Sequence, residues 1–329
     1  MFDTFLPIAL VAPVVFLLAG SGLVAALYPV LRPSLSRVHP VRRRSLLLAL
    51  AFAPLIGAVG LTAMAFMPSL VGLLWPALDH CTVHGLAGHP HLCLRHWSSQ
   101  APSLAAVMLV GGVLAVVVFS GVQQVLRLTA ASSLIRRLRS LVQKEVSSEG
   151  AAVLETAAPV ALTAGLLTQG VYVSTGLIDA LSPQQLEIVL AHERQHAAGR
   201  DPLWRAAVAL ASAVHLPGAR RQVLADLHLA CEQTCDEAAA RLTGNRPLVA
   251  ETILKVARLL QAYGEHQPKL ISGFGGHHVA ARVEALLEDH SGARWAPPRL
   301  AWLGLALTLA ALAEPLHHGI ETVLAVFAK

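Results

Sequence analysis

The sequence predicts a mainly α-helical integral membrane protein with four transmembrane helices and one charged α+β domain. First, 55% of its 329 residues are hydrophobic and only 14% are charged, whereas soluble domains carry about 25% charged residues. Second, the apolar residues gather in four nearly charge-free stretches, at 5–31, 46–74, 104–126 and 300–327. Each is long enough to cross a bilayer, which takes about 20 residues. Third, the residues between the last two stretches are charged and have a helical pattern.

The first apolar stretch is predicted to be an uncleaved transmembrane helix rather than a signal peptide. It lacks a basic segment before it, has Asp3 instead, and contains no clean A-x-A cleavage site. The predicted organisation has three transmembrane helices within residues 1–126 and the charged domain at 127–298. The fourth transmembrane segment and a short extracytoplasmic tail then occupy 299–329.

Basic residues beside the apolar stretches predict the orientation. The loop at 32–45 contains five arginines and no acidic residue, and such basic loops stay in the cytoplasm. We therefore expect the N-terminus outside a bacterial inner membrane and the charged domain inside. These arginines suffice to explain the net charge of +5, so anionic lipid is the expected partner and direct nucleic-acid binding is not expected.

The predicted outer loop, residues 76–103, is rich in histidine and cysteine. Cys81 and Cys93 would face a compartment in which a disulfide can form. The same cluster, which includes five histidines, is also typical of a copper or zinc site. Both interpretations remain open at this point. Cys231 and Cys235, in the inner domain, are expected to be reduced thiols.

The stretch "LSPQQLEIVLAHERQH" predicts a helix that carries a metal site. Its start is marked by a cap, a first-position proline and a capping-box glutamine, namely Ser182, Pro183 and Gln185. His192 and His196 lie four residues apart on this helix, so both imidazoles share one face and can bind one Zn²⁺. Glu193 lies beside that face and can act on water as a general base.

A second helix, "LHLACEQTCDEAAARLTG", ends at Gly244 and offers the remaining groups. A catalytic zinc takes three protein ligands, and Glu232 and Asp236 lie four residues apart on one helix face. We assign Glu232 as the third ligand and Asp236 as the carboxylate that orients a ligating histidine. Glu237 is the rival ligand, and Cys235 is expected to be a small packed residue.

These motifs resemble the membrane metallopeptidases of the BlaR/MecR antibiotic-sensor type. The resemblance comprises H-E-x-x-H, then Asp201 in "GRDPL", then E-x-x-C-D in the second helix, together with the topology. It implies a gluzincin (zincin-like) domain with Zn²⁺ on His192, His196 and Glu232 and with Glu193 as catalytic base. It also implies that an outside signal starts cleavage of the enzyme itself and of a cytosolic transcriptional repressor.

The resemblance has limits and alternatives. The antibiotic sensors carry a penicillin-binding domain after the fourth span, which has no counterpart before Lys329, so we do not expect β-lactam sensing. HtpX-type and CAAX-processing membrane proteases share H-E-x-x-H and have E-x-x-A-D, which makes membrane-protein quality control an alternative role. A non-catalytic metal-binding sensor is another, but a structural site has no need of a base such as Glu193.

A short β-run precedes the metal helix and consists of Val171, Tyr172 and Val173. Gluzincins bind an extended substrate along an edge strand near the metal by main-chain hydrogen bonds. This run is therefore a candidate substrate strand, and an ordinary hairpin that supports the helix is the alternative.

The segment "GGHHVAARVEALLED" resembles the basic segment that follows the active-site helices in the family, with Arg282 in the place of its arginine. Peptide hydrolysis needs a donor to the developing oxyanion. His277, His278 and Arg282 are candidates for this role, and a surface histidine pair is the alternative.

Overall fold

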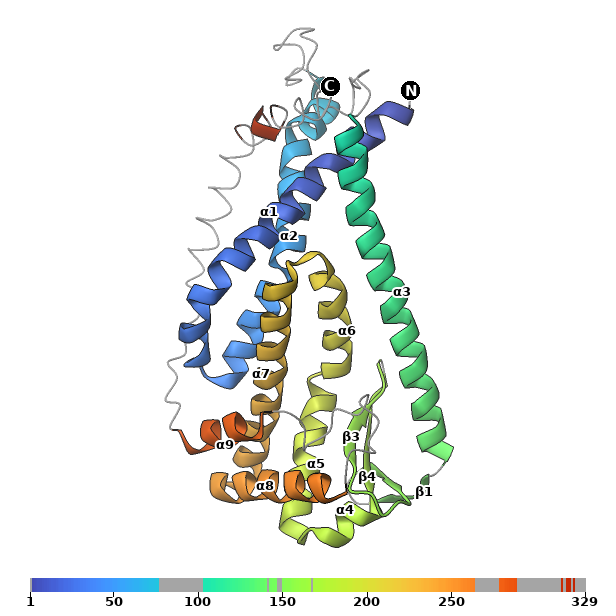
Figure 1. The fold of residues 1–329 in the computed structure, drawn as a ribbon, viewed down its shortest axis with the longest axis vertical. Coiled ribbons are helices and arrows are strands. Elements are labelled where there is room, and N and C mark those ends of the chain that lie inside the picture. The colour runs from blue at the N-terminus through green and yellow to red at the C-terminus, as the bar shows by residue number, and fades with distance from the viewer. Residues whose placement is uncertain are drawn as a thin grey trace.

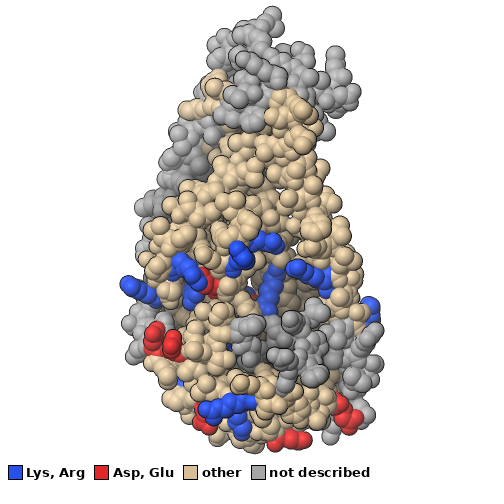
Figure 2. Space-filling view, in the orientation of Figure 1, with Lys and Arg blue, Asp and Glu red and all other residues tan. Residues whose placement is uncertain are grey.

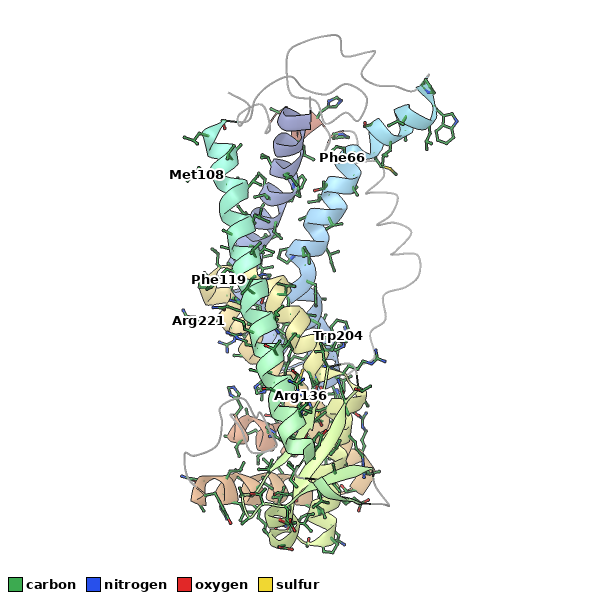
Figure 3. All side chains as sticks on the ribbon, turned by 90° about the vertical axis from the view of Figure 1, so that its right-hand side faces the viewer. Phe66, Met108, Phe119, Arg136, Trp204 and Arg221 are labelled. Carbon is green, nitrogen blue, oxygen red and sulfur yellow. The ribbon has the colours of Figure 1, made fainter. Side chains whose placement is uncertain are left out.

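The computed structural model describes most of the chain: residues 2–76, 103–140, 142–146, 150–166, 168–263, 278–288, 315, 318–320 and 322. Three long helices extend from the rest of the molecule toward one end (Figure 1). They are α1 (Phe2–Ser36), α2 (Pro40–Leu74) and α3 (Leu104–Ser140). Their segments Leu10–Ser36, Pro40–Met67 and Leu104–Ser133 are long and apolar enough to cross a membrane. Figure 3 shows Met108 and Phe119 on α3, which are 68% and 63% exposed, as lipid-facing side chains would be.

These helices contain the first three predicted spans and extend beyond them. The predicted loop at 32–45 is mostly helical, because α1 continues to Ser36 and α2 begins at Pro40. Helix α3 continues past residue 126 because residues 127–140 contain no glycine or proline to end it. The predicted fourth span at 300–327 falls almost wholly outside the described residues. So does the outer loop with Cys81 and Cys93.

The remaining chain begins with a small mixed sheet in the order β1-β2-β4-β3. Its strands are β1 (Val142–Val146), β2 (Ala151–Leu154), β3 (Ala161–Ala164) and β4 (Gly170–Ser174). Strand β4 pairs with β2 in parallel and with β3 in antiparallel fashion. Strand β3 is therefore an edge of the sheet, and β4 has neighbours on both sides.

Helices follow the sheet in sequence. They are α4 (Thr175–Ala180), α5 (Pro183–Ala198), α6 (Asp201–Ala211), α7 (Pro217–Thr243), α8 (Arg246–Ala262) and α9 (Val279–Leu287), with a short 3-10 helix η3 (Ser212–Val214) between α6 and α7. Helix α5 packs between the sheet and α7. The hydrophobic core there is fully buried. Residues with no exposed surface in it include Val173, Ile188, Val189, Ala239 and Ile253.

The predicted helix ends are confirmed at two places. The Ser182 hydroxyl accepts a hydrogen bond from the Gln185 amide, and the Gln185 side chain accepts one from the Ser182 amide, which completes the capping box of α5. Helix α7 ends at Gly244, whose φ of 64° is the left-handed conformation that glycine adopts without strain. They fix where α5 begins and where α7 ends.

Helices α6 and α7 form a hairpin that lies among the membrane helices rather than below them (Figure 1). Helix α2 packs along α6 and α7, and α3 contacts α6 and η3. Trp204 of α6 meets Phe52 of α2 edge to face, with ring centroids 6.2 Å apart. On the face shown in Figure 2, charged side chains occupy the lower half, and the described upper surface carries none. Side chains of α1, α2, α6 and α7 pack into one hydrophobic cluster, which includes Tyr28, Leu47, Val208 and Val223.

Asp226 of α7 is the polar centre of this junction. Its Oδ2 accepts hydrogen bonds from the Tyr28 hydroxyl at 2.6 Å and from Arg32 Nε at 2.6 Å, and Arg43 Nη2 lies 3.9 Å from its Oδ1. Burial raises the pKa of Asp226, but the hydrogen bonds from Arg32 and Tyr28 outweigh burial, so the net pKa is lowered. The folded protein therefore favours the carboxylate.

We expect Asp226→Asn to destabilise the protein by about 2 kcal/mol at neutral pH, because it leaves Arg32 and Arg43 without their counter-charge. Thermal unfolding of the full chain in detergent measures this loss of stability.

The stabilising effect of Asp226 should depend on pH. A carboxyl with a lowered pKa stabilises the fold above its unfolded pKa of about 4 and loses that effect as the pH falls through the folded pKa. The gap between wild type and variant should therefore shrink in acid. Asp179→Asn, at an exposed site, is the control, and an equal effect from it would contradict the prediction.

Candidate metal centre

Helix α5 places the H-E-x-x-H residues in a nearly closed interior. His192, Glu193 and His196 are 0%, 1% and 7% exposed. The Nε2 atoms of His192 and His196 face each other at 3.1 Å. Two nitrogen ligands on a tetrahedral zinc, each at about 2.0–2.1 Å, lie about 3.3 Å apart. The helix therefore holds the imidazoles at the spacing that one ion requires.

Helix α7 brings Glu232 to the same point. Its Oε2 lies 3.5 Å from His192 Nε2, and its Oε1 lies 3.6 Å from His196 Nε2. Burial raises the pKa of Glu232, but the hydrogen bond from His192 and the charges of His196 and Arg282 lower it well below its usual value. Two imidazole nitrogens and a carboxylate thus converge, which is a donor set that suits Zn²⁺.

A buried carboxylate contacts the far nitrogen of each imidazole. Asp236 Oδ1 lies 2.9 Å from His192 Nδ1, and Asp201 Oδ2 lies 2.6 Å from His196 Nδ1. Carboxylates at Nδ1 favour the tautomer with its proton there, which turns the lone pair of Nε2 toward the centre. Burial lowers the pKa of His192, but hydrogen bonds with Asp236 and Glu232 raise it to about 9. The same negative surroundings that favour a proton favour a metal cation.

Asp201 reaches His196 because of the turn between α5 and α6. Arg200 adopts a left-handed conformation with φ of 51°, which reverses the chain so that the first residue of α6 returns to the end of α5. The sequence motif contained Asp201, but its contact with His196 was not predicted.

Arg282 of α9 supports the other side of the centre. Its side chain has no exposed surface, and its Nε and Nη2 donate to Asp236 at 2.7 and 2.6 Å. Its Nη1 lies 3.4 Å from Glu232 Oε2. This enclosure favours a role in holding two carboxylates over the predicted role as an oxyanion donor. His278 is exposed at the start of α9, and His277 lies outside the described residues.

Two alternative ligands fit the centre less well than Glu232. Ligand atoms of His192, His196 and Cys235 all lie within 4.8 Å of one another, and the carboxylate oxygens of Glu232 lie 3.5 and 3.6 Å from the two imidazole Nε2 atoms. Burial and the nearby carboxylates raise the pKa of the Cys235 thiol well above its usual value, which disfavours the thiolate that binds metal. Glu237, the rival predicted from sequence, forms an ion pair with Arg246 at 3.0 Å instead.

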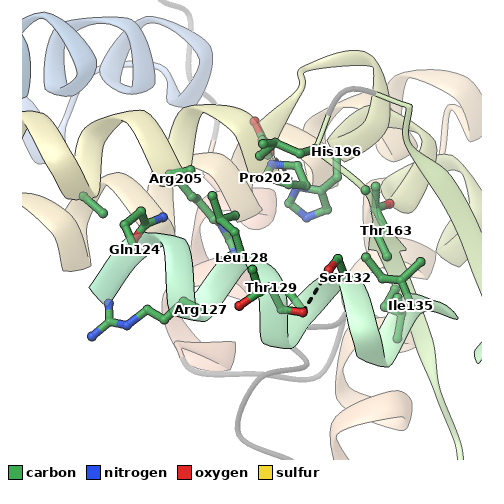
Figure 4. A pocket seen from close by; sticks show the side chains of 18 of the residues that line it. Gln124, Arg127, Leu128, Thr129, Ser132, Ile135, Thr163, His196, Pro202 and Arg205 are labelled. Carbon is green, nitrogen blue, oxygen red and sulfur yellow. Dashed lines mark hydrogen bonds and ion pairs between the residues drawn. The ribbon is translucent and has the colours of Figure 1, made fainter. Parts of the chain in front are cut away.

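A cavity of about 750 Å³, lined mainly by apolar residues, opens beside the centre. Figure 4 shows side chains of the membrane helix α3 on one side and of β3, α5 and α6 on the other. The labelled ones include Leu128, Ser132, Ile135, Thr163, His196 and Arg205. Helix α3 therefore forms one wall of the cavity that Glu193 and His196 also line.

Glu193 lines this cavity and is positioned from β3. The Thr163 hydroxyl lies 2.6 Å from the Glu193 carbonyl oxygen and 2.9 Å from its Oε2. Among the described residues, the buried Oε1 has no hydrogen-bond partner. An unsatisfied buried acceptor beside the two candidate metal ligands His192 and His196 is suited to act as a general base on water.

The predicted substrate strand, residues 171–173, is not an edge strand. Val171, Tyr172 and Val173 lie on β4, whose two edges already pair with β2 and β3, so no main-chain groups remain there for a substrate. Among the described strands, β3 has an unpaired edge and lies next to α5, and its Thr163 contacts Glu193. The β-run was visible in the sequence, but the strand order was not.

Two polar side chains at the centre were also missed. Arg205 Nη2 lies 3.2 Å from Glu232 Oε1, and His228 Nε2 lies 3.4 Å from the same atom. Burial and the charge of Arg205 lower the pKa of His228 to about 4, so its imidazole is neutral. The helical spacing was an available signal, since His228, Glu232 and Asp236 are four residues apart in turn.

Residues 129–265 match the family model "Peptidase family M48". No curated protein and no solved structure matches the chain. The matched segment begins within α3 and ends just after α8, so it contains α5 and α7 but neither α2 nor α9. The match does not single out the antibiotic-sensor type. It shows that this segment is similar to a zincin-like metallopeptidase domain, in a chain with three helices that could cross a membrane.

Proposed function

We propose that this chain is a membrane-bound zinc endopeptidase in which His192, His196 and Glu232 hold the ion and Glu193 is the general base. The observation that carries the proposal is the convergence of two imidazole Nε2 atoms and a carboxylate, 3.1–3.6 Å apart, beside a cavity lined by Glu193. The similarity of residues 129–265 to metallopeptidases supports the same conclusion.

A bound zinc ion would polarise the peptide carbonyl and lower the pKa of water. Glu193 Oε1 accepts the proton of the attacking water, and the resulting carboxylic acid then donates it to the leaving amine nitrogen. Thr163 holds the other oxygen of Glu193, which keeps the carboxylate directed at the cavity. Arg205, half-exposed in the same cavity, is available to donate to the developing oxyanion.

We propose β3 as the strand that pairs with an extended substrate, because no other described strand pairs with its outer edge and it contacts Glu193. A substrate lying there has α3 as its opposite wall, with Leu128 and Ile135 toward it. Apolar substrate side chains fit this lining best.

The biological role we propose is signalled cleavage of the protein itself or of a cytosolic repressor, with the active site in the cytoplasm. Quality control of membrane proteins and a non-catalytic sensor are the competing roles. Cleavage of one defined protein only after an outside stimulus favours signalled cleavage. Cleavage of many unfolded proteins without a stimulus favours quality control.

Replacement of Glu193 by glutamine should reduce peptide cleavage by about 10³-fold, because a general base contributes about 10²–10⁴-fold to such reactions. The measurement is an immunoblot of membranes from cells that make the tagged full chain, in which self-cleavage gives a shorter fragment. Glu187→Gln, at an exposed position on the same helix, should cleave normally. A fragment of equal intensity from Glu193→Gln would refute this role for Glu193.

Zinc content tests the ligand set without any substrate. The purified full chain should carry about one zinc per molecule by mass spectrometry, and His192→Ala should abolish it, because two ligands hold zinc far more weakly than three. Glu237→Ala should leave the zinc content unchanged, since Glu237 pairs with Arg246. A zinc-free Glu237→Ala and a zinc-loaded His192→Ala would reverse the assignment.

Filling the cavity from α3 should block substrate without removing metal. Ala131 lines the cavity, and Ala131→Trp should lower cleavage by about tenfold or more, because small misplacements of a substrate cost that much in rate. Ala130→Trp, one residue away at an exposed position, is the matched control. Cleavage as fast as wild type by Ala131→Trp, with normal zinc content, would exclude this cavity as the substrate path.

A further inference from the structure

The membrane helix α2 contacts the metal centre directly through Arg44. Its Nη2 donates to the Gly199 carbonyl oxygen at 3.0 Å and to Asp201 Oδ1. Asp201 in turn holds His196 Nδ1 through its other oxygen. Arg44 is the fifth residue of α2 and lies 157 positions from Asp201 in the chain. A chain of three side chains thus runs from a membrane helix to a ligand atom.

Burial makes this chain sensitive to the loss of one member. The side chain of Asp201 is 4% exposed and that of Arg44 is 17% exposed. A carboxylate with a different partner on each oxygen cannot rotate without breaking one contact. Without Arg44, the partner left to the Asp201 carboxylate among the described residues would be His196, which favours rotation of the carboxylate away from the contact that orients His196.

The backbone around this contact leaves little free space. A Cβ atom at Gly199 would lie 3.2 Å from Asp201 Oδ1 and 3.3 Å from Arg44 Nη2. Both distances are shorter than ordinary van der Waals contact. Glycine at the end of α5 therefore permits the approach of the arginine to the carboxylate.

The opposite side of the centre also has an arginine, an aspartate and a histidine in contact. Arg282 holds Asp236 with two hydrogen bonds, and Asp236 contacts His192 Nδ1. Each histidine thus has a buried aspartate, and each aspartate has an arginine from a helix outside the segment similar to peptidases. For His196 that helix is α2.

We propose that Arg44 is a positioning residue for the metal centre, so that the membrane helix α2 completes the centre by holding Asp201 against His196. The inference rests on the proposed ligand set and extends it, because it assigns part of the metal affinity to a membrane segment. Segment 129–265 by itself would lack this contact.

Zinc affinity of the purified full chain in detergent tests the proposal by competition with a chromophoric chelator. Loss of a residue that orients a metal ligand costs about 10–100-fold in affinity. We expect Asp201→Asn to raise the zinc Kd within that range and Arg44→Gln to raise it by about tenfold. The Kd of Arg44→Lys should lie between those of the wild type and Arg44→Gln. Arg37→Gln, an exposed arginine between α1 and α2, should leave the Kd unchanged.

A double-mutant cycle separates positioning from general stabilisation. If Arg44 acts through Asp201, then Arg44→Gln added to Asp201→Asn should change the Kd by less than about twofold. Multiplying effects, or a lower unfolding temperature of metal-free Arg44→Gln with an unchanged Kd, would overturn the proposal. Failure of the proposed function is distinguishable, because it would appear as wild-type protein that binds no zinc or binds zinc without Glu193-dependent cleavage.

Discussion

Two chains of polar side chains, each made of an arginine, an aspartate and a histidine, hold the proposed metal centre in place. Arg282, Asp236 and His192 form one chain, and Arg44, Asp201 and His196 form the other. Burying a charge is costly unless a partner with good geometry compensates it, and removing one partner costs about 3–5 kcal/mol. Asp201 uses one oxygen for Arg44 and the other for His196, whereas Oδ1 of Asp236 contacts both Arg282 and His192. The histidines are therefore oriented by the fold itself, before any ion binds.

This constraint explains why the helices meet as they do. Helix α5 supplies both histidines, but their orientation depends on α7, on the first residue of α6, on α9 and on α2. The α6–α7 hairpin packs among the membrane helices, so the centre lies where membrane helices and domain share a core. The membrane helices are consequently more than an anchor. Helix α2 contributes an arginine, and α3 contributes a wall of the cavity beside Glu193.

The same geometry assigns different work to residues that look alike in sequence. Glu232 faces the imidazoles, whereas Glu237, five residues further along the same helix, faces Arg246. Arg282 has no exposed surface and contacts two carboxylates, whereas Arg205 is partly exposed, lines the cavity and contacts Glu232 Oε1. A buried cation with two anionic partners stabilises a site, and a cation facing a cavity can also meet a substrate.

Local spacing determined what could be predicted from the sequence alone. The H-E-x-x-H residues and Glu232 with Asp236 follow from the four-residue repeat that places side chains on one face of a helix. The ends of α5 and α7 follow from Ser182, Gln185 and Gly244, because capping depends only on neighbouring residues. The three described membrane helices follow from the length of their apolar runs.

Only the tertiary structure decided which strand has a free edge and which arginines hold the aspartates. Strand order depends on crossover connections, so the β-run at 171–173 gave no sign that it pairs on both sides. Arg44 and Asp201 are 157 positions apart, and Arg282 and Asp236 are 46 apart. No local pattern relates residues so distant in the chain. Their pairing results from the packing of α2 against α6 and α7 and of α9 against α7, which buries the opposite charges together.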